Sequence, residues 1–412
     1  MNGPYPRIAF FPDAFHEVDG VAVVARNFAA YAQRWNIPFL MVHAGPCDQV
    51  VQEGSVTRMQ LRRSRLKFPL DRNHEFDLIL LRRYRGVAAM LREFKPDIVQ
   101  ITGPSDIGIL GALCAHNTDV PLAAFWQTNL PEYAGVRIAK ALKVLPNRVA
   151  RFFASAARTM AQLATMRFYR VAEILFAPNP EIVQTLSDAF GKPCFPMGHG
   201  VDANRFNPEF RDRRDGTFTI GYVGRLTSEK NVRLLAKLER ALVSRGLGDF
   251  RFLLVGHGAE MAWLRENLRC AEFPGVLRGD QLSHAFANMD VLAFPSETET
   301  FGLAVLEGLA SGVPVVAMEA GGPKYTVEHG KTGFVAKTFE EFASYVATLM
   351  SDPEMVSSMR EAGRSYAILN SWDSAFQAIY QTYRSHLADS AAMVTNDNTR
   401  SLDDSVLVQP IS

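Results

Sequence analysis

The sequence has few cysteines, no long apolar run and almost no net charge, and each absence excludes a class of protein. Its 412 residues include four cysteines, none in a Cys-x-x-Cys pair, which excludes a zinc cluster or a disulfide framework of the usual kind. No uncharged apolar stretch reaches the roughly 18 residues of a membrane-spanning helix. The opening apolar run, residues 8–11, is too short for a signal peptide. We therefore expect a cytoplasmic protein in a reducing compartment.

Common metal and nucleotide motifs are also missing. The chain has no Asp-x-Asp pair, and its nine histidines show no His-Glu-x-x-His spacing, so the sequence predicts neither a metal site nor a resident cofactor. The segment 256–258, Gly-His-Gly, lacks the third glycine of a dinucleotide fingerprint. Residues 330–332 mimic the end of a Walker A motif, but Tyr325 stands where its first glycine must be.

Charge is small in total but unevenly distributed. The formal net charge is +1 and 48% of the residues are apolar, which is typical of a soluble globular protein and argues against a nucleic-acid partner. Residues 1–200 nevertheless carry 23 Lys and Arg against 16 Asp and Glu, a net charge of +7, whereas residues 201–412 carry 21 against 27, a net charge of −6. An electropositive first half suits a protein that works at an anionic membrane surface.

The basic residues concentrate in two stretches. Eleven lie between Arg58 and Lys95, and eight lie between Arg137 and Arg170 with no acid among them. The second stretch interleaves Arg and Lys with apolar residues, as a basic amphipathic helix on anionic lipid does. A helix packed on the protein's own core with a solvated basic face has the same pattern. The sequence leaves both interpretations open, with a slight preference for the packed helix.

Short apolar runs alternate with helical patterns along the chain, which predicts an α/β fold with parallel sheets covered by helices on both faces. The predicted strands are Ile8–Phe11, 39–42, Ile98–Ile101, Leu122–Phe125, Ile174–Ala177, 220–223, 252–255, Val291–Phe294 and 313–317. The alternation restarts after the polar segment 204–216, which we interpret as an interdomain linker.

This organisation predicts two Rossmann-like, doubly wound domains, 1–203 and 204–370. A last helical pattern follows over 371–387, with Ser371 as its N-cap. Residues 388–412 are rich in Ser, Asn, Asp and Thr, so we predict a disordered tail.

The most informative segment is 294–316, in which a buried strand ends, a polar loop turns and a helix begins near Gly302. Glu299 lies in the loop and Glu307 inside the helix, so both carboxylates can reach a ligand at the helix N-terminus. Free amides over 300–303 can donate to sugar hydroxyls or phosphate. An acidic first turn that stabilises the helix dipole would explain Glu299 but not Glu307, which has apolar neighbours. We therefore favour a binding site.

A second segment, 221–231, is a glycine-bearing turn after a strand and contains Arg225 and Lys230. Two cations beside a tight turn suit a diphosphate, because Arg225 can grip two oxygens while Lys230 supplies a point charge. Solvated surface cations fit this turn equally well. In the first half, Gly20 opens a helix after the first strand and can let a ligand approach the backbone, although an ordinary turn glycine also fits.

In combination, these motifs resemble the retaining family-4 glycosyltransferases, which have the GT-B fold. The resemblance is based on Gly-Arg-x4-Lys at 224–230, Phe-Pro-Ser at 294–296, Glu-x7-Glu at 299–307, Ser-Gly-Val-Pro-Val at 311–315 and Gly-His-Gly-Val-Asp at 198–202. Each motif is loose alone, but their order and spacing are specific. The resemblance implies an acceptor-binding first domain and a nucleotide-sugar-binding second domain that face each other across a cleft. It also implies that the last helix crosses back to the first domain.

The resemblance implies a role for each matching residue. Arg225 and Lys230 would hold the donor diphosphate, and Glu299 would contact the transferred sugar; these three form the expected catalytic set. Glu307 would hydrogen-bond the ribose, and the loop that contains Gly279 would receive the base. The other expected donor-binding residues are Gly20, Thr300, Phe301, Gly302 and Leu303, and the expected acceptor- or sugar-positioning residues are Asp19 and Gln127.

By the same resemblance, transfer retains the anomeric configuration, and the departing diphosphate itself deprotonates the incoming hydroxyl. No metal is then required, because side-chain cations and helix amides can neutralise the diphosphate. The resemblance implies a GDP-mannose or UDP-hexose donor, with mannose favoured, and a lipid or glycan acceptor. We expect a cytoplasmic enzyme that attaches peripherally to the inner membrane face.

One position departs from the family pattern. Many relatives have His-Thr after the fourth strand of the first domain, whereas this chain has Gln127 and Thr128. Glutamine can donate a hydrogen bond but cannot titrate, so the alternative function is a nucleotide-sugar-binding protein with weak or no transferase activity. An epimerase of similar fold fits the Glu-x7-Glu segment less well. Chain length and the lack of a pyridoxal-lysine context argue against a phosphorylase.

Overall fold

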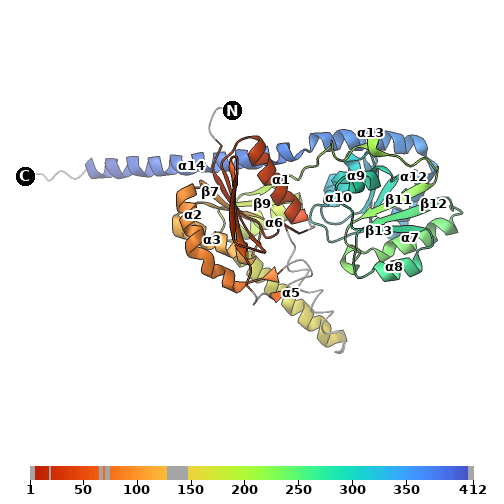
Figure 1. Ribbon diagram of the computed structural model, residues 1–412, viewed down its shortest axis with the longest axis horizontal. Coiled ribbons are helices and arrows are strands. Elements are labelled where there is room, and N and C mark those ends of the chain that lie inside the picture. The colour runs from red at the N-terminus through yellow and green to blue at the C-terminus, as the bar shows by residue number, and fades with distance from the viewer. Residues whose placement is uncertain (1–4, 18–19, 65–67, 70–74, 128–146, 407–412) are drawn as a thin grey trace, which may run out of the picture. The chain divides into compact units, whose positions relative to one another are not determined.

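The chain folds into two compact units in the computed structural model (Figure 1). The residues that the structure describes are 5–17, 20–64, 68–69, 75–127 and 147–406. Unit 1 comprises Met1–Ala177, Ile182–Met197 and Phe376–Ser412, and unit 2 comprises Pro178–Glu181 and Gly198–Ala375. The boundary between the units therefore lies a few residues before the predicted one at 203.

Unit 1 is built on an eight-stranded sheet with the order β10-β9-β8-β7-β1-β2-β4-β3. All neighbouring strands are parallel except the edge pair β3–β4. The strands are β1 (Ile8–Phe11), β2 (Phe39–Gly45), β3 (Gln49–Glu53), β4 (Val56–Arg62), β7 (Ile98–Ile101), β8 (Leu122–Phe125), β9 (Ile174–Ala177) and β10 (Cys194–Pro196), and a separate short pair is β5 (Phe68–Pro69) and β6 (Glu75–Phe76).

Helices cover both faces of this sheet. They are α1 (Gly20–Arg34), η1 (Leu78–Arg83), α2 (Tyr84–Phe94), α3 (Asp106–Thr118), α6 (Pro180–Phe190) and the part of α14 (Trp372–Val406) around Phe376 and Tyr383. The helix α5 (Asn147–Tyr169) extends away from the sheet (Figure 1). Tyr169 at its end packs into the core of the unit. One face packs against aliphatic side chains of α2, α3 and α6. The other face is aromatic: Phe28 of α1 stacks on Phe376 of α14 with ring centroids 4.6 Å apart. The Tyr383 hydroxyl of α14 donates to Gln100 Oε1 on β7 at 2.6 Å.

Unit 2 has a six-stranded, wholly parallel sheet with the order β13-β12-β11-β14-β15-β16. Its strands are β11 (Phe218–Val223), β12 (Phe250–Val255), β13 (Ala271–Gly275), β14 (Val291–Phe294), β15 (Val315–Met318) and β16 (Gly333–Ala336). Its helices are η2 (Pro208–Phe210), η3 (Ser228–Lys230), α7 (Arg233–Ser244), α8 (Met261–Asn267), α9 (Gly279–Ala287), α10 (Leu303–Ala310), α11 (Pro323–Thr326), α12 (Phe339–Ser351) and α13 (Pro353–Leu369).

Successive side chains of β14 point to opposite faces of the sheet in unit 2 and pack into two different cores. Val291 and Ala293 pack with α7 and α12, whereas Leu292 and Phe294 pack with α9 and α10. A strand covered on both faces is apolar at every position, which is why β14 is a continuous apolar run in the sequence. The predicted α/β architecture of two parallel sheets is confirmed.

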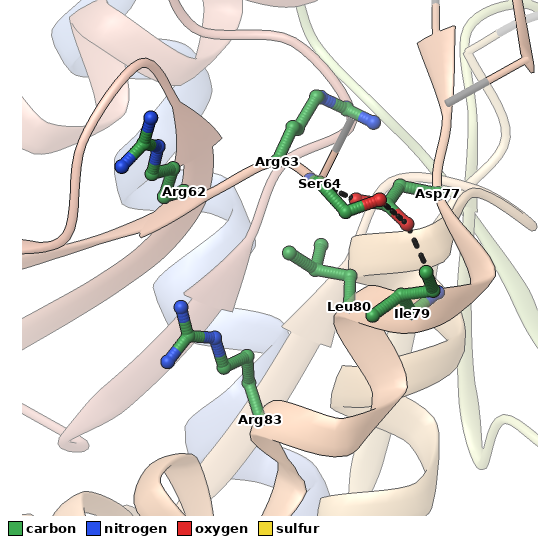
Figure 2. A pocket seen from close by; sticks show the side chains of 7 residues that line it. All are labelled: Arg62, Arg63, Ser64, Asp77, Ile79, Leu80 and Arg83. Atoms are coloured by element: carbon green, nitrogen blue, oxygen red, sulfur yellow. Dashed lines mark hydrogen bonds between the residues drawn. The ribbon is translucent and has the colours of Figure 1, made fainter. Parts of the chain in front are cut away.

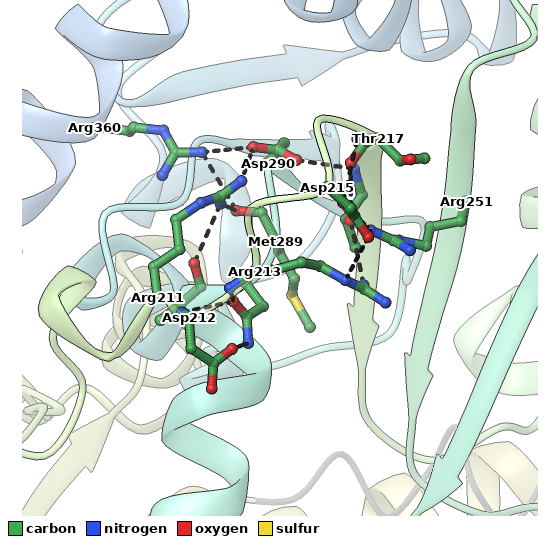
Figure 3. Close-up of polar contacts among 12 residues, drawn as sticks. Arg211, Asp212, Arg213, Asp215, Thr217, Arg251, Met289, Asp290 and Arg360 are labelled. Carbon is green, nitrogen blue, oxygen red and sulfur yellow. Dashed lines mark hydrogen bonds and ion pairs between the residues drawn. The ribbon is translucent and has the colours of Figure 1, made fainter.

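The segment 204–216 is not the free linker that its polar composition suggested. It belongs to unit 2, where ion pairs hold it (Figure 3). The Arg211 guanidinium donates to Asp290 Oδ1 at 2.8 Å, and Arg213 donates to Glu272 Oε1 at 2.7 Å. The linker interpretation was wrong because the partners of these arginines lie 59 and 79 residues away in the chain.

The C-terminal helix is longer than predicted. Ser371 caps α14 as predicted, since its Oγ accepts from the Ser374 N–H at 3.1 Å. The helix then continues to Val406, so the predicted disordered tail is wrong over 388–406. No glycine or proline occurs between Ser371 and Gln409, and without such a residue nothing in the backbone interrupts the helix.

Candidate active site

The loop between β14 and α10 is clamped by hydrogen bonds to its backbone carbonyls within unit 2. The Gly322 N–H donates to the Glu299 carbonyl at 2.8 Å, and Asn179 Nδ2 donates to the Thr300 carbonyl at 2.9 Å. Gly321 has a φ of +59°, and a Cβ there would lie 2.1 Å from the Glu299 carbonyl oxygen. Only glycine tolerates both this conformation and this approach. The clamp therefore fixes the backbone on which the Glu299 side chain stands.

Residues 297–299 of this loop lie against residues 229–231 of the turn that follows β11. Lys230 Nζ forms an ion pair with Glu299 Oε2. On either side, the Thr298 hydroxyl donates to the Glu229 carbonyl at 3.0 Å, and Asn231 Nδ2 donates to Glu297 Oε1 at 3.4 Å. The Lys230 side chain is only 9% exposed and the Glu299 side chain 26%. The structure thus joins two predicted site residues that lie 69 positions apart.

Sequence reasoning missed the flanking partners Thr298 and Asn231. Asn231 has a left-handed backbone with φ of +54°, a conformation in which asparagine is enriched. An asparagine directly after a predicted phosphate-binding lysine was therefore the available signal for a tight turn there.

Arg225 lies in the same turn. The Tyr222 hydroxyl donates to the Arg225 carbonyl at 3.0 Å, and the Gly224 N–H donates to the Val255 carbonyl at 3.0 Å. The Arg225 guanidinium lies 3.7 Å from Glu229 Oε1 and is 41% exposed. Its backbone is thus held, while its guanidinium is partly exposed to solvent beside Glu229.

The Gly-His-Gly segment that fails as a dinucleotide fingerprint shapes this turn. A Cβ on Gly256 would lie 1.9 Å from the Gly224 carbonyl oxygen, and a Cβ on Gly258 would lie 2.1 Å from the Leu226 carbonyl oxygen. The two glycines let the loop after β12 pack directly on the turn that holds Arg225. Sequence reasoning rejected the motif and so missed this role.

The N-terminus of α10 follows the clamped loop. Gly302, with φ of +89°, is the N-cap, and Leu303 is the first helical residue. Phe301 stacks on the His199 ring, with centroids 4.0 Å apart and an interplanar angle of 17°. The first amides of a helix have no intrahelical acceptor, so the 300–303 backbone offers donors to an anionic or hydroxylated ligand.

Glu307 is partly buried on α10, next to the buried side chain of Leu306. Burial raises the pKa of the Glu307 carboxyl to about 7, and the Arg205 guanidinium offsets part of the rise. At neutral pH this group can therefore both accept and donate a hydrogen bond.

Gly279 begins α9 with φ of +57°, and a Cβ there would meet no atom within 4 Å. The backbone conformation, and not a lack of space, is therefore what favours glycine here, and the space beside Gly279 is open. Leu277, two residues before Gly279, is partly buried against the core that α9 and α10 share.

The remaining predicted residues belong to unit 1. Gly20 is the exposed first residue of α1, and Asp19 lies outside the described residues. Gln127 follows β8, and its Nε2 lies 3.7 Å from the Met197 sulfur. Asp13, after β1, accepts from the Ser105 hydroxyl, and its N–H donates to Thr102 Oγ1 at 2.7 Å. Among the described residues, no group of three or more His, Cys, Asp or Glu could hold a metal ion.

Comparison with known proteins connects both units to glycosyl transfer. The model of the family "Glycosyl transferase 4-like domain" matches residues 13–193, and that of "Glycosyl transferases group 1" matches residues 204–366.

Two relatives match most of the chain. A GDP-mannose-dependent alpha-mannosyltransferase of Corynebacterium glutamicum is 28% identical over 313 residues, which cover 74% of this chain and 71% of the relative. A sulfoquinovosyl transferase of Arabidopsis thaliana is 30% identical over 395 residues, which cover 90% of this chain and 71% of the relative.

The fold has a close counterpart among solved structures. Sucrose-phosphate synthase from Thermosynechococcus elongatus superposes with a TM-score of 0.71 at 18% identity, covering 93% of this chain and 100% of that one. At this identity the likeness shows the fold alone. Together with the two family models and the sulfoquinovosyl transferase match, it places the chain in the family-4 glycosyltransferases of GT-B fold, as a hexosyltransferase.

Proposed function

We propose that the enzyme transfers a hexose, mannose by preference, from a GDP- or UDP-linked donor to a lipid or glycan acceptor with retention of configuration. The observation that carries the proposal is the Lys230–Glu299 pair, which joins the clamped loop before α10 to the turn after β11. A cation beside a carboxylate supports a site that binds a diphosphate and sugar hydroxyls together. The GDP-mannose-dependent relative supports mannose, and the sulfoquinovosyl transferase supports a hexose more generally.

In the proposed reaction, Lys230 and Arg225 bind the donor diphosphate and neutralise the charge that develops as the bond between C1 and the diphosphate oxygen breaks. The diphosphate keeps the electron pair of that bond and takes the proton of the acceptor hydroxyl. The acceptor oxygen forms the new bond to C1 on the same face. Glu299 and the 300–303 amides hold the sugar, while Glu307 binds the ribose and the Gly279 loop receives the base.

Incubating the full chain with GDP-mannose, UDP-glucose and UDP-galactose, with nucleotide release as the readout, tests the proposal. We expect the fastest release with GDP-mannose, an α-linked product by NMR, and no loss of rate on adding EDTA. A β-linked product would refute retention, and an EDTA-sensitive rate would refute metal independence. No release and no transfer with any donor would refute the function.

We also propose that the enzyme attaches peripherally to an anionic membrane on its cytoplasmic side. The helix α5 exposes 50% of Phe153, 70% of Met160 and 66% of Leu163. Their i, i+7 and i+10 spacing puts all three on one face. The basic stretch between Arg137 and Arg170, with no acid, supplies the charge complementarity. Among the described residues, no helix has the length and apolarity to span a bilayer.

Co-sedimentation with phosphatidylglycerol vesicles tests this attachment. We expect binding that weakens with added salt and weakens further in the variant Met160→Ser/Leu163→Ser. Binding that depends on neither anionic lipid nor salt would overturn the proposal.

A further inference from the structure

Unit 1 contains a cavity of about 360 Å³ that is lined in part by three arginines (Figure 2). It lies where β4 ends at Arg62 and where η1 ends at Arg83. β4 runs parallel to β2, with Arg62 level with Gly45, so the cavity lies at the carboxyl edge of the sheet. Ligands of open parallel sheets bind at this edge, and the volume is within the range of small-molecule sites.

The charged groups of the inner wall already have partners within the protein. Asp77 is fully buried and accepts hydrogen bonds from the Ser64 N–H, from the Ser64 hydroxyl at 2.9 Å and from the Ile79 N–H at 2.9 Å. Burial raises the pKa of Asp77, but these hydrogen bonds outweigh it and lower the pKa below its ordinary value. Arg63 forms an ion pair with the buried Asp106. Asp77 therefore stays ionised, and Asp106 already balances the charge of Arg63, so the inner wall supplies no cation for a ligand.

The outer wall is different, because two arginines there share one exposed carboxylate. Asp48 Oδ1 accepts from the Arg62 main-chain N–H at 2.9 Å, and Asp48 Oδ2 accepts from the Arg83 guanidinium at 2.7 Å. Asp48 and Arg83 are each about half exposed. Within the described part of the chain, the Arg62 guanidinium has no hydrogen bond or ion pair. Figure 2 shows the Arg62 and Arg83 guanidinium groups on the same side of the cavity, with Arg63 turned away.

We propose that Arg62 and Arg83 bind a phosphate group of the acceptor. Asp48 already holds the Arg62 backbone and the Arg83 side chain in place, and two guanidinium forks can together grip the oxygens of one phosphate. Ile79 and Leu80 line the same cavity and can cover the carbon skeleton that carries the phosphate. That the phosphate belongs to the acceptor rests on the proposed function; that the cavity binds phosphate does not.

Binding of two probes to the full chain tests the proposal: glycerol 3-phosphate by calorimetry, and vesicles of phosphatidylglycerol in phosphatidylcholine by co-sedimentation. The test variant is Arg62→Gln/Arg83→Gln. Its matched control is Arg85→Gln, an exposed arginine of α2 that does not line the cavity. Because the test variant loses charge-assisted hydrogen bonds to the phosphate, we expect it to bind roughly tenfold more weakly and the control to match the wild type.

Loss of glycerol 3-phosphate binding in the test variant alone supports a soluble phosphate acceptor. Loss of vesicle binding alone, again with an unchanged control, supports a phospholipid headgroup. If neither probe binds, or if Arg85→Gln weakens binding as much as the test variant, the proposal is overturned.

Binding of GDP or UDP to unit 2 residues serves as the folding check and must be unchanged in the test variant. If phosphate binding depends on Arg62 and Arg83 but no donor is turned over, the phosphate site is supported and the proposed glycosyl transfer is refuted. If donors are turned over but the loss of both arginines leaves phosphate binding unchanged, the phosphate site is refuted and the proposed glycosyl transfer is supported.

Discussion

The two units are built on similar parallel sheets but hold their cations differently. In unit 2, Lys230 is almost fully buried and paired with Glu299 on a loop that Gly321 and Gly322 clamp. In unit 1, Arg62 is exposed, and among the described residues its guanidinium has no partner. A buried cation with a fixed partner is preorganised for one geometry. Exposed guanidiniums can adapt to ligands of several shapes, which suits an acceptor site more than a donor site.

The largest effect is expected where the fixed pair is broken. Lys230→Ala removes the buried cation and leaves Glu299 without its partner, so kcat/KM for the donor should fall by about 10²–10³-fold. Nucleotide release measures this. The control is Lys331→Ala, which removes a 68% exposed lysine that pairs with Glu328. A Lys230→Ala enzyme with wild-type turnover would show that the pair is not the donor site.

The clamp can be tested separately from the charge. Gly321→Ala forces a Cβ against the Glu299 carbonyl oxygen, whereas Gly330→Ala has a similar positive φ of +78° and no atom within 4 Å. Both variants place an alanine in the left-handed backbone conformation, which costs about 1–2 kcal/mol of folding free energy. Only Gly321→Ala adds overpacking of about 1–3 kcal/mol and should also weaken nucleotide binding. Denaturant unfolding and calorimetry measure the two effects, and equal losses in both variants would contradict the clamp.

The partly buried carboxyl of Glu307 in unit 2 predicts a pH dependence of stability. Because the folded-state pKa of Glu307 is about 7 against an ordinary 4.5, the folded protein binds the extra proton between those values. Its contribution to the free energy of unfolding is therefore full below about pH 4.5 and is lost as pH rises through 7, by up to about 3 kcal/mol. Glu307→Gln should remove this loss.

Denaturant unfolding at pH 5 and pH 8 measures the Glu307 effect. The wild type should lose more stability than Glu307→Gln between the two values, while Glu340→Gln, at a 77% exposed side chain, should behave as the wild type. If the free energy of unfolding changes equally in the wild type and in Glu307→Gln between pH 5 and pH 8, the raised pKa of Glu307 is refuted.

The smallest effect is expected at Gln127 in unit 1. If the departing diphosphate takes the acceptor proton, this position needs only to place a hydrogen bond, so Gln127→His should change turnover by less than about tenfold. Gln127→Ala, which removes the hydrogen bond, should be slower than both. A gain in turnover of about 10²-fold in Gln127→His would instead indicate general-base catalysis by histidine at this position. The wild-type enzyme would then be slower because it lacks that base.

Local patterns predicted the buried elements well and the exposed ones poorly. β1, β7, β8 and β9 lie at the predicted residues because strands covered on both faces are apolar throughout. The edge strand β3 is almost wholly exposed and left no such pattern. The segment 204–216 was misread for a related reason: its polarity reflects ion pairs with distant residues such as Asp290, which composition cannot reveal.

Sequence alone indicated the fold class and the family, because both depend on short-range pattern and on the order and spacing of motifs. It also led to the prediction of Arg225, Lys230, Glu299 and Glu307 as donor-site residues. Only the tertiary structure decided that Lys230 pairs with Glu299, that the Gly-His-Gly loop supports the Arg225 turn, and that Arg62 and Arg83 meet at one cavity. Each of these depends on chain segments far apart in sequence, whose contact is set by strand order in the sheets and by close packing of backbone on backbone.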